Sequence, residues 1–170
     1  MSTRFGIGYD AHQLTTGVPL VLAGVAVNHD SGLAGHSDGD VATHAIIDAL
    51  LGAAALGDIG MHFKENDPTV PSGISSVVLL GRAMELLTAA GWMVVNVDAT
   101  IIAQGPRLAE HITAMRRAIA GAMGTVAENV SIKATTEDRM GYTGAAQGIS
   151  AMAVASLTEL IREEPIHETF

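Results

Sequence analysis

Short apolar segments bounded by turn residues are the first pattern visible in the chain. Their β-branched and aliphatic content, in places alternating with polar positions, predicts strands at residues 4–10, 18–27, 92–104 and 129–136. The residues LTTG, at 14–17, are typical of a turn between the first two strands. These two strands are therefore expected to be separated by only a short connection.

Longer apolar stretches without an internal proline predict three helices. Residues 40–56 are rich in Ala, Leu and Ile, so this helix is expected to be buried, with Gly57 as its stop signal. The second helix is expected at 72–90. The third is expected to have Pro106 in its first turn and to end near Gly124, because proline is tolerated at the start of a helix and glycine commonly ends one.

Three segments are less regular. Residues 57–73 are rich in Gly, Pro, Asn and Asp, which suggests a mobile loop. Residues 148–161 have the length and the alanines of a helix, but their apolar positions also alternate as in a strand, so the pattern leaves both structures open. We expect a single domain at 1–162 and a polar, frayed C-terminal tail at 163–170.

Composition narrows the class of protein. The chain has 170 residues, of which 48% are hydrophobic and 16% charged, so it is expected to fold around a substantial core. No apolar run is long enough to span a membrane, the first residues lack a signal-peptide pattern, and cysteine is absent, so we expect a cytoplasmic protein without disulfides or thiolate metal sites. A net charge of −9 argues against nucleic-acid binding; an anionic ligand would need help from metal ions or backbone amides.

Three metal-capable side chains stand out. Asp10 and His12 are two residues apart, so they point to one side of a strand, and His44 lies on the predicted buried helix. Taken alone, the Asp-x-His pair reads more simply as a hydrogen-bonded pair at a strand end. Together with His44 it forms an Asp/His/His set with one open position, which is typical of catalytic zinc. Asp40 and Asp48 share the helix face of His44 and could orient it, although Asp40 also suits a helix cap and Asp48 a solvated position.

Two polar segments could contact phosphate or a second metal ion. The glycine-broken GHSDGD before the buried helix offers backbone amides and the Ser37 hydroxyl, although such loops are most often helix caps. After the strand at 129–136, Thr and acidic residues offer hard oxygen ligands for magnesium or manganese, although they are also common in turns. The G-x-G-x-x-A pattern at 6–11 is not a dinucleotide site, because β-rich sequence with Pro19 follows it instead of a helix.

The segments GYDAH, GHSDGDVATHAIIDALLGAAALGDIGMHF, NVDATIIAQGPRL and KATTEDRMGYTGAAQGI occur in this order along nearly the whole chain. In this combination the chain resembles the 2-C-methyl-D-erythritol 2,4-cyclodiphosphate synthases of the non-mevalonate isoprenoid pathway. The resemblance implies an α+β fold, with a mixed sheet and helices packed on one face. It also implies a homotrimer around a central threefold axis, with active sites at subunit interfaces, and a strand at 148–161.

The resemblance further implies a metal-dependent lyase reaction. The enzyme would cyclise 4-diphosphocytidyl-2-C-methyl-D-erythritol 2-phosphate to 2-C-methyl-D-erythritol 2,4-cyclodiphosphate and release CMP. One Zn²⁺ per subunit would be bound by Asp10, His12 and His44, and Mg²⁺ or Mn²⁺ would accompany the substrate and contact Asp138. These four residues form the expected catalytic set. The expected substrate contacts are His36, Ser37, Asp58, Ile59, Gly60, Glu65, Ala103, Pro106, Arg107, Leu108, Ala109, Ala134, Thr135 and Thr136.

Several positions depart from the family pattern. Glu137 and Asp138 stand where the family has a threonine followed by an acidic residue, and we favour Asp138 for the second ion. Arg107 replaces a lysine, which keeps the charge but changes the geometry, and Glu65 replaces an aspartate. Ala145 replaces an arginine of the central cavity, so an isoprenoid diphosphate site there is doubtful.

Two other functions compete with this one. The chain could be a non-catalytic trimeric zinc-binding homologue, which release of CMP would exclude. An unrelated zinc hydrolase is disfavoured, because no separate general base is evident beside the three ligands.

Overall fold

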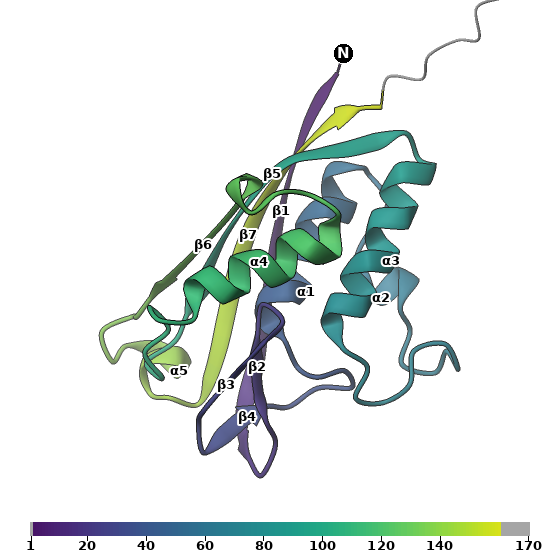
Figure 1. The fold of residues 1–170 in the computed structure, drawn as a ribbon. Coiled ribbons are helices and arrows are strands. Elements are labelled where there is room, and N and C mark those ends of the chain that lie inside the picture. The colour runs from purple at the N-terminus through teal and green to yellow at the C-terminus, as the bar shows by residue number, and fades with distance from the viewer. Residues whose placement is uncertain (1, 161–170) are drawn as a thin grey trace, which may run out of the picture.

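A five-stranded mixed sheet forms the frame of the computed structural model, which describes residues 2–160 (Figure 1). The strand order is β4-β1-β7-β5-β6, and β5 and β6 are the parallel pair in an otherwise antiparallel sheet. A separate hairpin consists of β2 and β3. The strands are β1 Thr3–Thr16, β2 Leu20–Leu22, β3 Val25–Val27, β4 Ser31–Leu33, β5 Trp92–Ile102, β6 Val130–Thr135 and β7 Gly148–Glu159.

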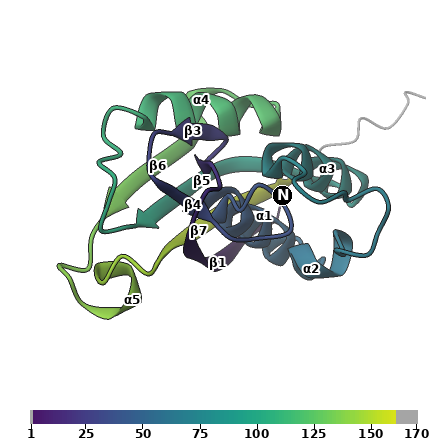
Figure 2. The same cartoon turned by 90° about the horizontal axis from the view of Figure 1, so that it is seen from below.

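The longer helices cover one face of this sheet (Figure 2). α1 packs on β1 and β7 and also contacts α3, while α4 packs against α3 and β6. This arrangement confirms the expected α+β class with helices on one face. The helices are α1 Val41–Ala53, α2 Ile59–His62, α3 Ser76–Ala89, α4 Ile112–Met123 and α5 Gly141–Gly144, with a 3₁₀ turn η1 at Ala127–Asn129. Among the described residues, no helix has both the length and the apolar character of a membrane span.

Two glycines of β1 explain how closely α1 lies on the sheet. A Cβ atom at Gly6 would stand 2.1 Å from the carbonyl oxygen of Ala49, and one at Gly8 would stand 2.0 Å from that of Ala45. No side chain fits at these distances, so the backbones of β1 and α1 are in direct contact. The G-x-G of the sequence is therefore a packing motif, in agreement with its rejection as a dinucleotide site.

The other face of the sheet is apolar but exposed. Side chains alternate along β1, so Phe5, Ile7 and Tyr9 point away from the helices and are 71%, 66% and 53% exposed. Met152 and Val154 on the neighbouring β7 pair with Tyr9 and Ile7 and are also exposed. We call these five residues the open apolar face. It is a contiguous surface of the kind that marks an interaction site.

The strand predictions are correct in position but wrong in some boundaries. β1 continues through the predicted turn at 14–17, because Leu14 to Thr16 pair with β4, and the chain turns at Gly17 with φ 81°. The predicted strand at 18–27 is a hairpin, broken at Ala23 and Gly24, where φ is 47° and 74°. Residues 148–161, for which both structures were open, form β7 up to Glu159.

The predicted helices exist, but some of their ends differ. The third helix begins at Ile112 rather than at Pro106, because residues 106–108 are irregular and residues 109–111 form a turn. The second begins at Ser76 rather than at 72. Gly57 does not terminate α1. Ala55 takes the left-handed conformation with φ 58°. The backbone N–H groups of Ala55 and Leu56 donate to the carbonyl oxygens of Gly52 and Leu51, a hydrogen-bond pattern that is characteristic of helix C-termini.

Two irregular segments complete the comparison. The loop predicted at 57–73 contains the short α2. The predicted tail at 163–170 lies outside the described residues. The described residues share one hydrophobic core, built from α1, the helix-facing side of the sheet and the inner faces of α3 and α4.

Candidate metal centre and active site

Asp10, His12 and His44 meet at the junction of β1 and α1, as predicted. The Asp10 Oδ2 atom lies 2.8 Å from His12 Nε2 and 2.9 Å from His44 Nδ1, and the two nitrogens are 3.3 Å apart. Asp10 and His12 follow Gly6 and Gly8 on the same side of β1, so the close approach of α1 brings His44 to them. This is the one such cluster of potential metal ligands found among residues 2–160.

The geometry of these atoms suits a small divalent metal ion. Zinc binds nitrogen and oxygen ligands at about 2.0–2.2 Å in a tetrahedron, so its ligand atoms stand about 3.3 Å apart. The separation of the two nitrogens equals this value, and the two separations from Asp10 Oδ2, at 2.8 Å and 2.9 Å, are somewhat shorter. His12 Nδ1 is hydrogen-bonded to the Ala34 carbonyl oxygen, which can only accept, so this nitrogen donates and Nε2 keeps its lone pair for a metal. The donor set and the histidine tautomer thus both fit zinc.

Charge within the cluster is consistent with this role. Burial alone would raise the pKa of Asp10, but hydrogen bonds and charge interactions with His12 and His44 outweigh it and hold the pKa well below its usual value. When a proton instead of a metal ion occupies His12 Nε2, this nitrogen donates to Asp10, and the hydrogen bond raises the pKa of His12 against the effect of burial. Asp10 is therefore ionised at neutral pH, as a metal ligand must be.

The partners of His44 differ from those that the sequence suggested. Asp40 does cap α1, but its buried carboxylate accepts hydrogen bonds from Thr43 and from the backbone of Ala23 and Gly24, not from the imidazole. Asp48 also does not reach the ring, so the expectation that either aspartate orients His44 is wrong. Instead, His44 Nε2 lies 3.0 Å from the Ser37 hydroxyl and 2.9 Å from the Ser76 hydroxyl.

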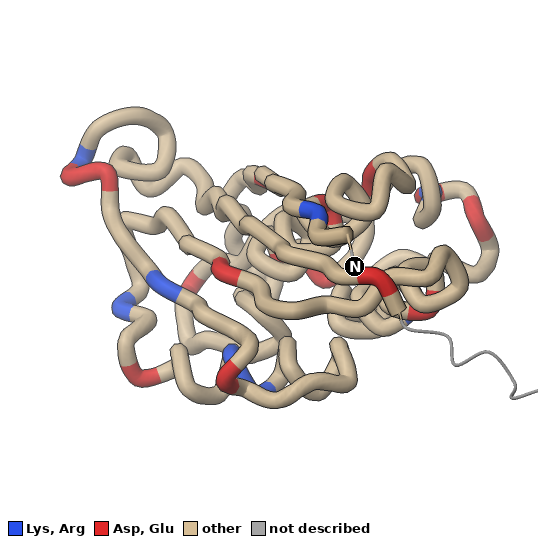
Figure 3. The backbone as a smooth tube through the Cα atoms, turned by 90° about the horizontal axis from the view of Figure 1, so that it is seen from above, with Lys and Arg blue, Asp and Glu red and all other residues tan. Residues whose placement is uncertain are grey.

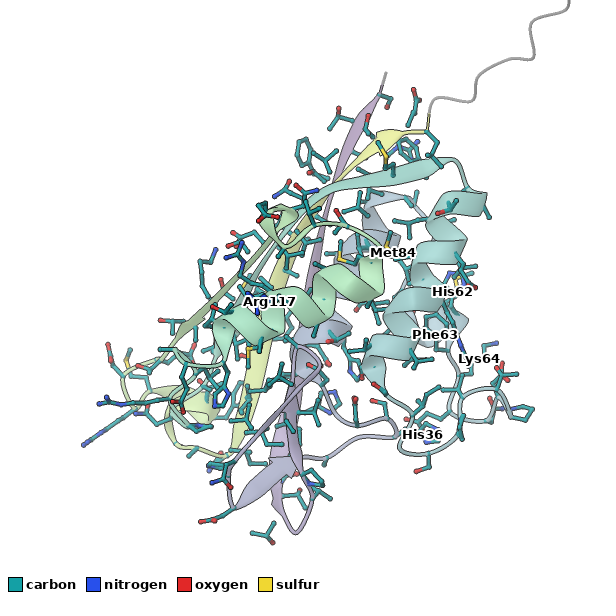
Figure 4. All side chains as sticks on the ribbon, viewed as in Figure 1. His36, His62, Phe63, Lys64, Met84 and Arg117 are labelled. Carbon is teal, nitrogen blue, oxygen red and sulfur yellow. The ribbon has the colours of Figure 1, made fainter. Side chains whose placement is uncertain are left out.

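A cavity of about 450 Å³ opens beside these three residues. Five of the predicted substrate contacts line it: His36, Ser37, Ile59, Gly60 and Glu65. Other lining residues were not predicted, namely Asp48, Phe63, Lys64, Val70 and Leu79. His36, Phe63 and Lys64 gather near the loops that flank α2 (Figure 4). Lys64 and Val70 belong to no sequence motif, so their position at the cavity could not be predicted from the sequence.

Asp48 fixes one wall of this cavity. Its Oδ1 atom accepts a hydrogen bond of 2.8 Å from the backbone N–H of Ile59, at the start of α2. Burial raises the pKa of Asp48, and the nearby carboxylates of Asp58 and Asp10 raise it further. The hydrogen bond from Ile59 acts in the opposite direction, but the net effect is a raised pKa. Asp48 is thus half-buried, with one carboxylate oxygen bound to α2, rather than simply solvated. Asp58 is the N-cap of α2 and accepts from Met61, next to the lining residues.

Asp58 itself lines neither cavity, and the other eight predicted substrate contacts line a second cavity of about 460 Å³ at β6 and the turn after β5. Gln104 and Ile112 were not predicted but line it as well. This cavity shares no lining residue with the first, and β7 and β5 separate β6 from β1 in the sheet. The predicted residues here are Ala103, Pro106, Arg107, Leu108, Ala109, Ala134, Thr135 and Thr136.

Asp138 lies in the turn that follows β6, outside the residues lining either cavity. Its backbone φ is 50°, and Thr136 Oγ1 donates to its carboxylate and accepts from its N–H. The next residue, Arg139, donates its N–H to the side chain of Gln104, which ties this turn to the second cavity. The neighbouring Glu137 accepts a hydrogen bond from the Thr143 hydroxyl. Each carboxylate thus accepts one hydroxyl hydrogen bond, but Glu137 is tied to the buried Thr143, whereas the Thr136 partner of Asp138 is exposed.

Positively and negatively charged residues are distributed unevenly over the molecule (Figure 3). Most of the described lysines and arginines lie between residues 107 and 139, in the half that holds the second cavity. The first cavity is lined by the carboxylates of Asp10, Asp48 and Glu65, and Lys64 is the lysine among its lining residues. A polyanionic ligand placed there would thus be repelled unless a metal ion contributed positive charge.

Comparison of the sequence with known proteins gives consistent matches. The sequence model of the YgbB family matches residues 3–158. A 2-C-methyl-D-erythritol 2,4-cyclodiphosphate synthase of Desulfitobacterium hafniense is 50% identical over 157 residues, which cover 92% of this chain and 99% of the relative. The synthase of Syntrophomonas wolfei subsp. wolfei is 53% identical over 156 residues, with coverage of 92% and 99%.

Solved structures of similar fold include two in complex with CDP. IspF of Plasmodium falciparum with CDP has a TM-score of 0.81 at 29% identity, covering 94% of this chain and 98% of that one. A CDP-bound 2C-methyl-D-erythritol-2,4-cyclodiphosphate synthase has a TM-score of 0.84 at 34% identity, covering 91% and 100%. The bifunctional IspDF of Campylobacter jejuni has a TM-score of 0.89 at 34% identity, covering 94% of this chain and 43% of the longer protein.

Proposed function

The chain belongs to the YgbB family of 2-C-methyl-D-erythritol 2,4-cyclodiphosphate synthases, and from this premise we propose how its residues carry out the reaction of the isoprenoid pathway. The substrate is 4-diphosphocytidyl-2-C-methyl-D-erythritol 2-phosphate, and the products are 2-C-methyl-D-erythritol 2,4-cyclodiphosphate and CMP. The observation that carries the proposal is the Asp10, His12 and His44 cluster, which lines a cavity of about 450 Å³.

The reaction needs positioning more than it needs a protein nucleophile. An oxygen of the 2-phosphate attacks the β-phosphorus of the diphosphate, and the bond to the oxygen of the α-phosphate breaks, which releases CMP. Both groups belong to one substrate molecule, so holding them in contact supplies much of the rate acceleration. The protein must therefore fold the substrate so that the two phosphates meet, and must balance their charge.

Asp10, His12 and His44 would hold Zn²⁺, which when bound supplies Lewis-acid polarisation of a phosphate oxygen. The Ser37 hydroxyl lines the same cavity and can donate to a phosphate oxygen. His36 Nε2 donates to the Val70 carbonyl oxygen at 2.8 Å. This hydrogen bond ties the GHSDGD segment to Val70, which also lines the cavity. These residues together orient the phosphate that is attacked.

The methylerythritol unit would lie against the start of α2. Asp48 holds the Ile59 backbone in place, and Gly60 beside it leaves the cavity open on this side. Asp58 can accept from substrate hydroxyls with the carboxylate oxygen that does not cap Met61. Glu65 lines the same cavity and is a further candidate contact.

The cytidine diphosphate would occupy the second cavity. Its lining of small side chains at Ala103, Ala109 and Ala134 leaves room for a flat base, and Arg107 can pair with a phosphate. Thr135 and Thr136 offer hydroxyls at the same cavity. Asp138, in the turn tied to this cavity, would bind Mg²⁺ or Mn²⁺, whose charge stabilises the departing CMP.

We further propose a homotrimer in which neighbouring subunits complete each active site. Two observations support it. The open apolar face is too large and too apolar to remain in water without cost, so a symmetric assembly that covers it is favoured. The two cavities lie on separate strands of one chain, which fits a site formed by the metal centre of one subunit and the nucleotide cavity of the next.

A direct product assay tests this function. The purified protein, supplied with zinc and Mg²⁺ or Mn²⁺, should release CMP and form a cyclic diphosphate whose two phosphorus signals are coupled in the ³¹P NMR spectrum. Omitting Mg²⁺ and Mn²⁺ should suppress the reaction. Zinc binding without any CMP release would instead support a non-catalytic zinc-binding homologue.

A further inference from the structure

The metal ligand His44 has a second ring nitrogen that faces two serines. Ser76, in the first turn of α3, is fully buried and does not line the cavity, while Ser37 does line it. Both hydroxyls are within hydrogen-bond distance of His44 Nε2, at 2.9 Å and 3.0 Å. The two serines are therefore equivalent in distance to the ring but different in their access to a ligand.

The direction of the hydrogen bonds distinguishes the two serines. The Ser76 hydroxyl is also bonded to the carboxylate of Asp38, and a carboxylate can only accept. Ser76 must therefore donate its single proton to Asp38 and can only accept from His44. The imidazole then carries its proton on Nε2, which leaves the lone pair on Nδ1, the atom that faces Asp10 and His12.

Asp38 is itself held firmly. One carboxylate oxygen accepts from the backbone N–H of Ser76 at 3.0 Å, and the other accepts from that of Asp40 at 3.2 Å. Its own N–H donates to the Ile74 carbonyl oxygen at 3.0 Å. The negative charge thus has a fixed position behind Ser76, at the start of both α1 and α3.

We propose that Ser76 and Asp38 form a hydrogen-bonded relay that selects the metal-binding tautomer of His44 and strengthens it as a ligand. The order is His44 Nε2–H to Ser76 Oγ, then Ser76 O–H to Asp38. The relay leaves the Ser37 hydroxyl proton free to bind phosphate in the cavity. Ser76 and Asp38 are positioning residues, and the inference rests on the proposed role of His44 as a zinc ligand.

Zinc affinity of the purified protein, measured by competition with a chromophoric chelator, tests the relay. Ser76→Ala should weaken zinc binding about 10- to 100-fold, the usual effect of removing a partner of a metal-bound histidine. Asp38→Asn, which keeps the shape but removes the charge, should weaken it in the same direction by less. Ser75→Ala is the matched control, because Ser75 is the adjacent residue, is exposed and makes no capping hydrogen bond with its side chain.

Two further readouts separate the relay from a purely structural role. In ¹⁵N-labelled, zinc-loaded protein, His44 should give a slowly exchanging Nε2–H signal that is lost or shifted in Ser76→Ala. The unfolding temperature of each metal-free variant shows how much Ser76 and Asp38 contribute to α3. A Ser76→Ala protein that is less stable but binds zinc with wild-type affinity would overturn the relay.

The inference and the proposed function can fail separately. If His44→Ala loses zinc and Ser76→Ala does not, His44 is a ligand and the relay is wrong. If His44→Ala binds zinc as tightly as wild type, the ligand assignment itself is wrong, and the relay with it.

Discussion

At the residue scale, the metal cluster follows from a simple spacing and from one tertiary contact. Asp10 and His12 share a side of β1 because strand side chains alternate, and this could be predicted from the sequence. The position of His44 was predictable as helical, but its approach to β1 depends on Gly6 and Gly8. Ser76 and Asp38 could not be predicted, because they are 38 residues apart and no local pattern connects them.

Protons should compete with zinc at this cluster. The hydrogen bond that His12 donates to Asp10 raises the pKa of His12 in the metal-free protein, and zinc can bind only a ring nitrogen that carries no proton. Zinc affinity should therefore fall by about tenfold per pH unit once the pH drops below this raised pKa. Chelator competition at a series of pH values measures this effect, and an affinity independent of pH from 8 down to 5 would contradict it.

The stability of the metal-free protein should show the opposite trend. A histidine whose pKa is raised on folding stabilises the folded state below its unfolded pKa, and this contribution is lost as the pH rises through the folded pKa. The pair of His12 and Asp10 should thus stabilise the metal-free protein most in mildly acidic solution. Unfolding temperatures with and without zinc, compared at about pH 6 and pH 8, should show the zinc-induced increase growing with pH.

The dependence of the rate on Mg²⁺ or Mn²⁺ should show which of two adjacent carboxylates, Glu137 or Asp138, binds the second metal ion. Asp138→Ala should reduce CMP release and raise the Mg²⁺ or Mn²⁺ concentration needed for half-maximal rate, with little change in zinc content. Glu137→Ala should have the smaller effect on ion dependence, because Glu137 is bound to the buried Thr143 hydroxyl, whereas the Thr136 partner of Asp138 is exposed. Titration of each variant with Mg²⁺ and Mn²⁺ provides the measurement. An equal loss in Glu137→Ala alone would assign the ion to Glu137.

At the element scale, the direct contact of β1 with α1 determines the position of the site. Element positions were largely predictable from periodicity, whereas their ends depended on partners distant in sequence. β1 extends to Thr16 because β4 pairs with it, and α1 ends at Ala53 with Ala55, not a glycine, in the left-handed conformation after it. Pro106 suited a helix start, but the chain there forms the turn of the second cavity instead.

Replacing Gly8 by alanine tests this contact. The new Cβ would stand 2.0 Å from the Ala45 carbonyl oxygen, so α1 must move, and we expect a loss of about 3 kcal/mol or more in the free energy of unfolding. Gly121→Ala in α4 is the matched control, because nothing lies within 4 Å of a Cβ there and alanine favours a helix by about 0.5–1 kcal/mol. Denaturant unfolding of both variants measures the difference, and equal stabilities would refute the packing role of Gly8.

At the scale of the whole molecule, the open apolar face and the separated cavities both indicate an assembly. The sequence alone suggested a trimer only through resemblance, because an exposed apolar strand face looks the same in sequence as a buried one. The expectation of a cytoplasmic location stays a prediction. Three carboxylates line the first cavity, whereas Arg107 is the charged side chain that lines the second, and this difference suits the proposed sites between neighbouring subunits.

A charge placed on the open apolar face should disrupt this assembly. Ile7→Glu should convert the proposed trimer to monomers, because a carboxylate cannot be buried without a partner, and CMP release should fall to background. Val126→Glu, at a similarly exposed valine outside this face, should leave both properties unchanged. Light scattering coupled to size-exclusion chromatography gives the mass of each variant. An active Ile7→Glu monomer would contradict shared active sites.

The central claim is that one metal ion, held by Asp10, His12 and His44, is required for the cyclisation. The most direct measurement is the zinc content and the rate of CMP release of His44→Ala in one preparation, with His29→Ala, an exposed histidine outside the cluster, as control. We predict about one zinc per chain and full activity in wild type and His29→Ala, and loss of both zinc and CMP release in a folded His44→Ala protein. Normal turnover by His44→Ala would contradict the account.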